Sequence, residues 1–315
     1  MSIVSIVIVK LIIILFFGYF LYKKNLIDNR VLEFLTSFVI NFTLPFLGFY
    51  HIVLNLKKEN PIFIFKFVIL SFIIFFTGLL VGLIFSIKKN NEFRREFISL
   101  VSFQNSGYLP LNIIFFLLPA GIKEKFIIYI FLYILGFDIM MWSVGSFFIF
   151  KRREEKFKLK SIFTPPIMAT ILGLFFVYTG ININNFLADL ILSTLKMVGD
   201  LSFVLSMIIL GCWLARINLE GFLKNLFVLL EASFLKLIVV PVIFYFIFLK
   251  FKIFSEFGFL AILQASMPSA VSLPIIVNFR KANSEFVSQG VFISHILSIF
   301  TIPIWLAFYL KFWRF

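Results

Sequence analysis

Charged residues, cysteine and histidine are scarce in this sequence. Only 14% of its 315 residues are Asp, Glu, Lys or Arg, and it has one Cys and two His. Soluble domains carry about 25% charged residues, so the composition excludes a soluble globular protein. The single Cys212 excludes a disulfide framework, and two distant histidines with one cysteine offer no metal site.

Two kinds of functional motif are also missing. The chain has no phosphate-binding G-x-x-x-x-G-K-[ST] segment, which argues against ATP-driven transport within this chain. It also has no nucleophile–base arrangement of the kind that covalent catalysis needs. We therefore expect neither an enzyme nor a resident cofactor, and a coupling proton or sodium ion is left open.

Long apolar runs are what the sequence has in abundance. Hydrophobic residues make up 62% of the chain, including 49 Phe. An apolar run of about 20 residues is long enough to cross the hydrocarbon core of a bilayer. The sequence therefore predicts an all-α integral membrane protein, with the first run retained as a span and not removed as a signal peptide. The ten expected spans are residues 3–22, 31–54, 62–87, 96–119, 126–150, 163–181, 187–215, 222–249, 255–279 and 286–312.

The basic residues fix the expected orientation. The net charge is +14, which we assign to topology and to contact with anionic lipid headgroups, not to nucleic-acid binding. With the N-terminus outside, cytoplasmic loops hold 17 Lys and Arg and extracytoplasmic segments hold 8. The positive-inside rule then places both termini outside the cell membrane and the central basic loop Lys151–Lys160 in the cytoplasm.

Five spans on either side of the central loop predict a repeat of inverted topology. We expect a first five-helix half at residues 1–160 and a second, inverted half at 161–315. Similar polar, proline-containing segments occur in the fourth span, Phe103–Ile113, and in the ninth, Leu263–Ile276. Proline breaks or kinks a helix, so both spans are expected to be interrupted near mid-membrane.

Matched breaks of this kind indicate a transporter binding site. A half-helix that starts within the membrane presents free backbone amides, which favour an anion. A proline kink surrounded by Ser and Asn also occurs as ordinary helix–helix contact, and this reading stays open for either span alone. The residues that we expect to bind substrate are Asn105, Ser106, Gly107, Pro110, Gln264, Pro268 and Ser269.

Four short segments resemble the auxin efflux carrier family of the wider bile/arsenite/riboflavin transporter superfamily. Asn105–Pro110 is similar to the family's N-x-G…P segment, and Thr164–Thr170 is similar to N-P-P-I-I-A-T, with Thr164 in place of Asn. Met267–Val271 is similar to M-P-S-A-V, and Thr43–Pro45 also matches. The seventh span lacks the proline that the family pattern has near Val204.

The resemblance implies a function as well as a fold. It implies five-plus-five inverted helices whose fourth and ninth members cross as broken helices, with Asn105 and Pro268 at the crossing. It also implies a secondary transporter of a small organic anion, either auxin-like or a dicarboxylate, working by alternating access against a scaffold of spans one, two, six and seven. A homodimer through the scaffold helices is a further expectation.

Four other polar residues are candidates for ion coupling or for a supporting network. A charge within a membrane span is usually functional or paired. Lys196 and Asp200 are four residues apart, so a structural salt bridge is an equal alternative. Asp138 has no acidic neighbour, which weighs against a sodium/proton exchanger, and His295 is either a proton site or a hydrogen-bonded interior residue.

Other classes of function remain as alternatives. An ion-coupled exchanger or a sensor built on the same transporter fold would share the broken helices. A membrane enzyme acting on lipid would need ionisable residues clustered near one interface, whereas the polar residues here lie at mid-depth. The substrate and the bilayer are therefore the expected partners, without nucleic acid.

The predicted topology can be tested in the central loop. A cysteine introduced at Lys156 is expected to react with an impermeant thiol reagent only from the cytoplasmic side, because the 17 inside charges hold this loop there. Labelling in intact cells and in inverted vesicles measures this. Reaction in intact cells would contradict the inverted repeat.

Overall fold

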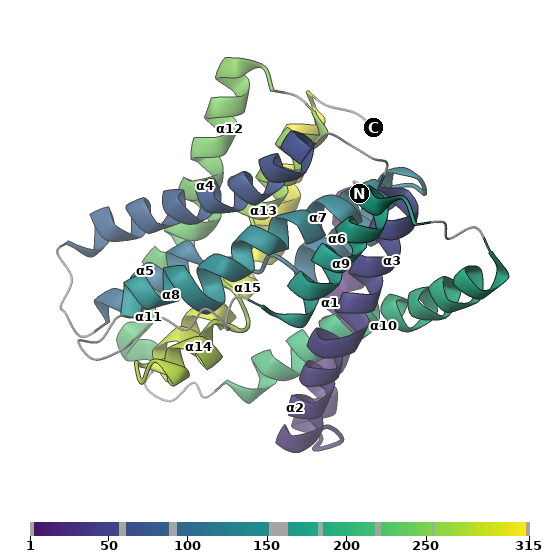
Figure 1. The fold of residues 1–315 in the computed structure, drawn as a ribbon. Helices are drawn as coiled ribbons and strands as arrows, with labels where there is room; N and C mark the ends of the chain where they lie inside the picture. Colours follow the sequence, from purple (N-terminus) through teal and green to yellow (C-terminus); the bar gives the residue numbers. More distant parts are fainter. Residues whose placement is uncertain are drawn as a thin grey trace.

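The computed structural model describes residues 3–56, 61–87, 93–150, 163–181, 185–217, 222–253 and 255–312 (Figure 1). This part of the chain is all-helical and contains no β-strand. The central basic loop and position 156 lie outside the described residues. The expectation of an all-helical chain is thus confirmed for the part that the structure describes.

Seven of the described helices are long and apolar enough to cross a membrane. They correspond to the first, second, third, fifth, seventh, eighth and tenth expected spans, while the other three expected spans contain shorter helices. The helices are α1 Ile3–Lys23, α2 Asn29–Phe38, α3 Leu44–Asn55, α4 Pro61–Ser86, α5 Arg94–Ser102, α6 Tyr108–Leu117, α7 Ile122–Asp138, α8 Val144–Phe150, α9 Pro165–Thr179, α10 Phe186–Arg216, α11 Phe222–Phe234, α12 Val240–Phe251, α13 Glu256–Ala265, α14 Leu273–Phe279 and α15 Ser284–Leu310.

Three spans contain a wide π-helical turn, at Val39–Thr43, Ile139–Ser143 and Leu235–Val239. Proline explains the last of these. Pro241 has no N–H to donate to the carbonyl four residues earlier, at Leu237, so the helix widens there. The freed Leu237 carbonyl accepts a hydrogen bond from the Trp305 indole at 2.8 Å, so its polar group is satisfied inside the membrane.

The fourth and ninth expected spans are each divided into two helices. In the fourth, residues 103–107 separate α5 from α6, and Pro110 lies in the first turn of α6. In the ninth, residues 266–272 separate α13 from α14, which starts five residues after Pro268. This second half-helix starts beyond Pro268 because Pro268 lies in extended contact with the other break, and Pro274 in the first turn of α14 opens the helix instead.

Packing separates the helices into two groups. The scaffold group is α1, α2, α3, α9 and α10, in which α1 packs along α10 and α3 packs on α9 and α10. The broken-helix group is α4–α8 with α11–α15, in which α4 packs on α5 and α7, and α15 packs on α11, α13 and α14. Contacts of α3 with α7, and of α6 with α1 and α10, join the groups.

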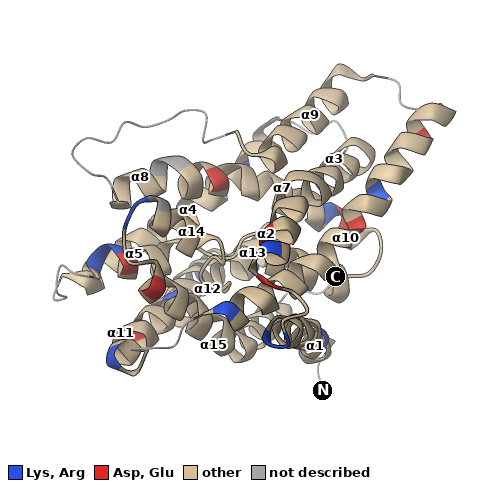
Figure 2. Cartoon of the chain, turned by 90° about the horizontal axis from the view of Figure 1, so that it is seen from below, with Lys and Arg blue, Asp and Glu red and all other residues tan. Residues whose placement is uncertain are grey.

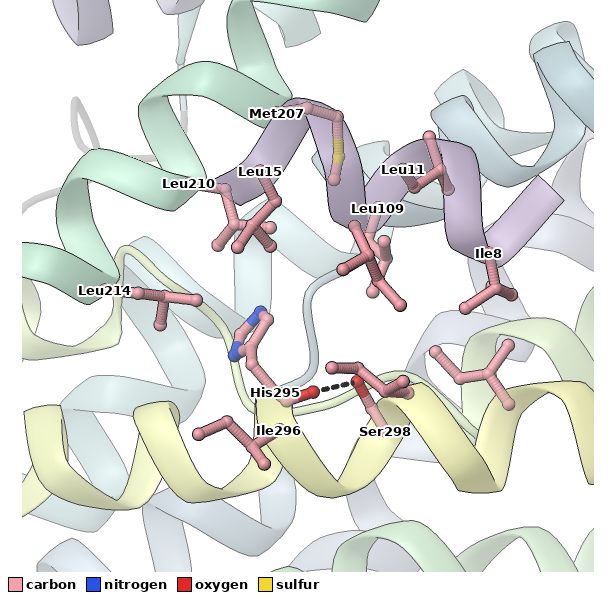
Figure 3. Close-up of a pocket in the computed structure, with 13 residues that line it drawn as sticks. Ile8, Leu11, Leu15, Leu109, Met207, Leu210, Leu214, His295, Ile296 and Ser298 are labelled. Carbon is pink, nitrogen blue, oxygen red and sulfur yellow. Dashed lines mark hydrogen bonds between the residues drawn. The ribbon is translucent and has the colours of Figure 1, made fainter. Parts of the chain in front are cut away.

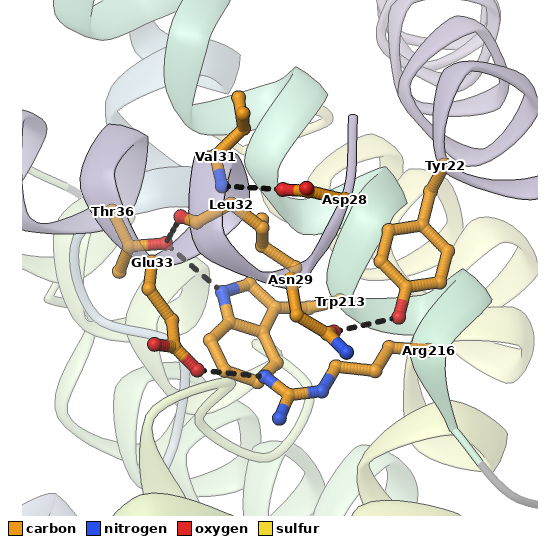
Figure 4. A network of polar contacts seen from close by, with 9 residues as sticks. All are labelled: Tyr22, Asp28, Asn29, Val31, Leu32, Glu33, Thr36, Trp213 and Arg216. Carbon is orange, nitrogen blue, oxygen red and sulfur yellow. Dashed lines mark hydrogen bonds and ion pairs between the residues drawn. The ribbon is translucent and has the colours of Figure 1, made fainter. Parts of the chain in front are cut away.

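Close approach and a polar network hold the scaffold group together. A methyl group added to Gly18 would meet the Ile208 backbone, so this glycine lets α1 lie directly against α10. Near the C-terminal ends of α1 and α10, the Trp213 indole donates to Thr36 at 3.2 Å, and Arg216 lies 3.6 Å from the Glu33 carboxylate (Figure 4).

The outer faces of the helices are suited to lipid. Large apolar side chains are exposed on both groups, among them Phe16, Phe65 and Phe227. Charged residues are sparse along the described helices (Figure 2). This distribution is that of a multi-pass membrane protein, in which apolar side chains face hydrocarbon.

Candidate functional site

The two breaks are held together by backbone hydrogen bonds. The Asn105 N–H donates to the Pro268 carbonyl at 2.7 Å, and the Ala270 N–H donates to the Phe103 carbonyl at 3.1 Å. Gln104 and Ser269 lie opposite each other as an isolated antiparallel pair. Each break therefore satisfies backbone groups that the other leaves without a helical partner.

Polar side chains complete this junction. The Ser269 hydroxyl donates to the Leu100 carbonyl in the last turn of α5 at 2.7 Å. The Gln264 amide nitrogen donates to the Ser106 carbonyl at 3.1 Å. Both side chains are buried, so these bonds form away from water. The residues predicted from the fourth and ninth spans thus lie together.

Asn105 connects the junction to the tenth span. Its amide nitrogen lies 3.3 Å from Nε2 of His295 on α15, and its amide oxygen accepts from the Leu109 N–H at 3.4 Å. Gly107 is the N-cap residue of α6 and has no side chain that could cap the helix. The amide of Asn105 is therefore oriented from both ends.

A mainly apolar cavity of about 70 Å³ lies beside this junction (Figure 3). Its walls come from α1, α6, α10 and α15, so it lies between the scaffold group and the broken-helix group. Leu11, Leu109, Met207 and Leu210 are typical of the lining. His295 and Ser298 are its polar side chains and lie on the same helix, α15, and His295 is the one that contacts Asn105.

A fully buried lysine lies on the other side of the junction. The Lys236 ammonium, in the π-helical turn of the eighth span, donates to the side-chain oxygen of Gln104 at 3.3 Å. The Gln104 amide nitrogen donates in turn to the Tyr133 hydroxyl. Among the described residues, no carboxylate is ion-paired with Lys236. A lone buried cation of this kind is costly, so Gln104 is its principal compensation.

The sequence did not assign Lys236 or Tyr133 to the site. Lys236 could be noticed as a charge within an apolar span, five residues before Pro241, but its partner is more than a hundred residues away in the chain. Tyr133 gives no signal, because a tyrosine in an apolar span is ordinary. Both assignments need the tertiary structure.

The remaining predicted polar residues lie apart from the junction. The Asp138 carboxylate accepts from the Thr164 hydroxyl at the start of α9 at 2.8 Å, which links the two groups of helices. Lys196 and Asp200 form an ion pair along α10, with 44% and 36% of their side chains exposed. This pair is the structural alternative that the four-residue spacing allowed.

Comparison with known protein families shows a match in two stretches. A family model described as a membrane transport protein matches residues 3–160 and residues 153–306. The two matched stretches together cover nearly the whole chain. No curated protein matches it.

The contact between Gln104 and Lys236 can be tested by stability. Gln104→Leu leaves the buried ammonium without its oxygen acceptor and is expected to cost about 1–3 kcal/mol, measured as a fall in Tm of the detergent-solubilised protein. Adding Lys236→Met removes the charge, so the double variant is expected to recover most of the loss.

Tyr133→Phe is the matched control for that experiment. It removes the other hydrogen bond of Gln104 without stranding a charge, and is expected to cost about 0.5–1.5 kcal/mol. If Gln104→Leu lowers the stability by the same amount in the wild-type protein and in the Lys236→Met variant, the two side chains are not coupled.

Proposed function

The chain belongs to the membrane transport protein family, the auxin efflux carrier family that its motifs resemble, and on this premise we propose that it is a secondary carrier of small organic anions. We propose that the substrate binds where the two broken helices meet. The observation that carries the proposal is the pairing of the two breaks beside a cavity between the two groups of helices.

The proposed fold has ten spans arranged as two inverted halves. In it, α5 with α6 forms the fourth span and α13 with α14 forms the ninth, and these cross at Asn105 and Pro268. The hydrogen bond between these two residues supports the assignment. Both termini would lie outside the cell membrane, and exposed faces of the scaffold group would be available for a homodimer.

The proposed mechanism is alternating access. The broken-helix group would move against the scaffold group and open the cavity first to one side of the membrane and then to the other. The division of the packing into two groups supports this, because each group is held together by more extensive helix contacts than those that join it to the other.

The proposed substrate is a carboxylate with an apolar body. The aliphatic walls around Leu11, Met207 and Leu210 suit a hydrocarbon part. The Asn105 amide suits a carboxylate at one end, because its nitrogen carries a second hydrogen besides the one that it directs at His295. A second carboxylate in the aliphatic part would have no partner there, so a monocarboxylate fits better than a dicarboxylate.

An ion-coupled exchanger is the second candidate. The buried Asp138 carboxylate, bound to Thr164 across the two groups, favours it, because a proton or a sodium ion on Asp138 would alter that contact. The two candidates differ in one property: a carrier transports a carboxylate, whereas an exchanger of ions alone does not.

The substrate class is tested by counterflow in proteoliposomes. Labelled phenylpropionate is expected to exchange, and unlabelled phenylpropionate is expected to compete better than phenylpropionamide, phenylpropylamine or succinate. These analogues separate negative charge, absence of charge, positive charge and a second carboxylate. Stronger competition by the amide or the amine than by the carboxylate would refute an anion carrier.

The role of Asn105 is tested in the same assay. Asn105→Ala removes both side-chain contacts, to His295 and to the start of α6, and is expected to abolish counterflow while leaving folded, detergent-extractable protein. Asn55→Ala is a matched control, because Asn55 also contacts a histidine, His51, but on a scaffold helix. Unimpaired exchange by Asn105→Ala would remove this residue from the site.

A further inference from the structure

The hydrogen bonds of His295 define which ring nitrogen carries the hydrogen. Nδ1 lies 2.8 Å from the Val291 carbonyl oxygen, which can only accept, so Nδ1 must donate. In the neutral ring Nε2 is then an acceptor, and it receives the Asn105 amide N–H at 3.3 Å. The Asn105 oxygen is occupied by the Leu109 N–H, which is consistent with this orientation.

No charged side chain compensates His295. Among the described residues, none forms an ion pair with its ring, which lies against the aliphatic cavity wall (Figure 3). Three titratable groups on elements that pack on α15 are engaged elsewhere, Glu96 with Asn283, Lys236 with Gln104 and Glu256 with Lys125. The other titratable groups on α15 and on the helices that pack on it or line the cavity with it are Lys10, Tyr19, Tyr22, Lys23, Arg94, Arg95, Tyr108, Asp189, Lys196, Asp200, Cys212, Arg216, Lys224, Glu231, Glu285 and Tyr309.

We propose that His295 binds a transported proton, and that this proton and the substrate carboxylate occupy the junction together, so that the protein is a proton–carboxylate symporter. This inference rests on the proposed function. The proton comes from water on one side of the membrane, binds Nε2 and leaves to water on the other side. No covalent bond other than this N–H bond is made or broken.

Hydrogen bonding makes either ligand unfavourable alone. Once Nε2 carries a proton, it and the Asn105 amide nitrogen are two donors facing each other. An acceptor between them removes the conflict, and a carboxylate supplies two acceptor oxygens. Conversely, a carboxylate in this aliphatic cavity has no cation beside it unless His295 is protonated. The two bound together form a neutral pair.

The experiment measures uptake driven by a pH difference. His295→Gln keeps a polar side chain that can accept from Asn105 but cannot carry a proton at neutral pH. In proteoliposomes, the variant is expected to lose counterflow of phenylpropionate, because no protonated ring faces the carboxylate. With a pH difference of about one unit imposed across the membrane, the wild-type protein is expected to raise the initial rate of phenylpropionate uptake above that of protein-free vesicles, and the variant is expected to add nothing to the passive rate. Vesicles without protein measure passive entry of the acid.

The second histidine provides the matched control. His51 also lies beside an asparagine amide, with Asn55 at 3.3 Å from its Nδ1, but it lies on α3 in the scaffold group. His51→Gln is expected to leave the gradient-driven initial rate of uptake unchanged. Gradient-driven uptake by His295→Gln at the wild-type rate would overturn the proposal.

A measurement on the wild-type protein alone tests the proposal even if the His295→Gln variant does not fold. Entry of phenylpropionate is expected to bring one proton with each molecule, detected by a pH dye inside the vesicles after the passive signal is subtracted. Counterflow without proton entry would overturn the symport and leave the anion carrier standing. Absence of wild-type counterflow for every carboxylate would instead refute the proposed function itself.

Discussion

The absence of water from the hydrocarbon core is the constraint on which this structure depends. A helix that is interrupted within the membrane leaves backbone donors and acceptors that lipid cannot satisfy. The two interrupted spans meet this constraint together, because Asn105 donates to the Pro268 carbonyl and Ala270 donates to the Phe103 carbonyl. Neither break would be satisfied alone. Two segments far apart in the chain are therefore brought to one place, and the cavity is formed beside them.

The extended pairing also separates the surroundings of neighbouring side chains. Successive residues of an extended segment point to opposite sides, so Gln104 and Asn105 face different neighbours. Gln104 contacts Lys236 and Tyr133, whereas Asn105 contacts His295 beside the cavity. A resident cation is thus held on one side of the junction, and the side that borders the cavity has no fixed charge among the described residues. This arrangement suits the proposed binding of a carboxylate together with a proton on His295.

Local chemistry determines how much of this could be predicted from sequence. The two breaks were predictable, since each combines a proline, Pro110 or Pro268, with neighbouring polar side chains that can satisfy freed backbone groups. The later start of α14 was not, because it depends on contacts of Pro268 with the other break. The contact of Lys236 with Gln104 was also hidden, since nothing local sets a pairing between residues so distant in the chain. Length and hydropathy predicted ten spans, of which seven are long helices; the sixth is the shorter α9, and the fourth and ninth are each divided into short helices.

The proposed movement between the two groups requires that the contacts that join them can break and form again easily. Two of these are the hydrogen bond from the Asn112 amide to the Ser206 hydroxyl, at 2.9 Å, and that from Thr164 to Asp138. A hydrogen bond contributes a net of about 0.5–1.5 kcal/mol between neutral groups and about 1.5–3 kcal/mol to a charged group, so breaking one of these bonds shifts the balance between two arrangements by only a few kcal/mol. The scaffold group, by contrast, is joined through the direct backbone approach at Gly18, where a shift of α1 would collide with α10. Direct backbone contact of this kind therefore lies within the scaffold group, whereas side-chain contacts, such as these hydrogen bonds and the packing of Gly48 against the Phe131 ring, lie between the groups.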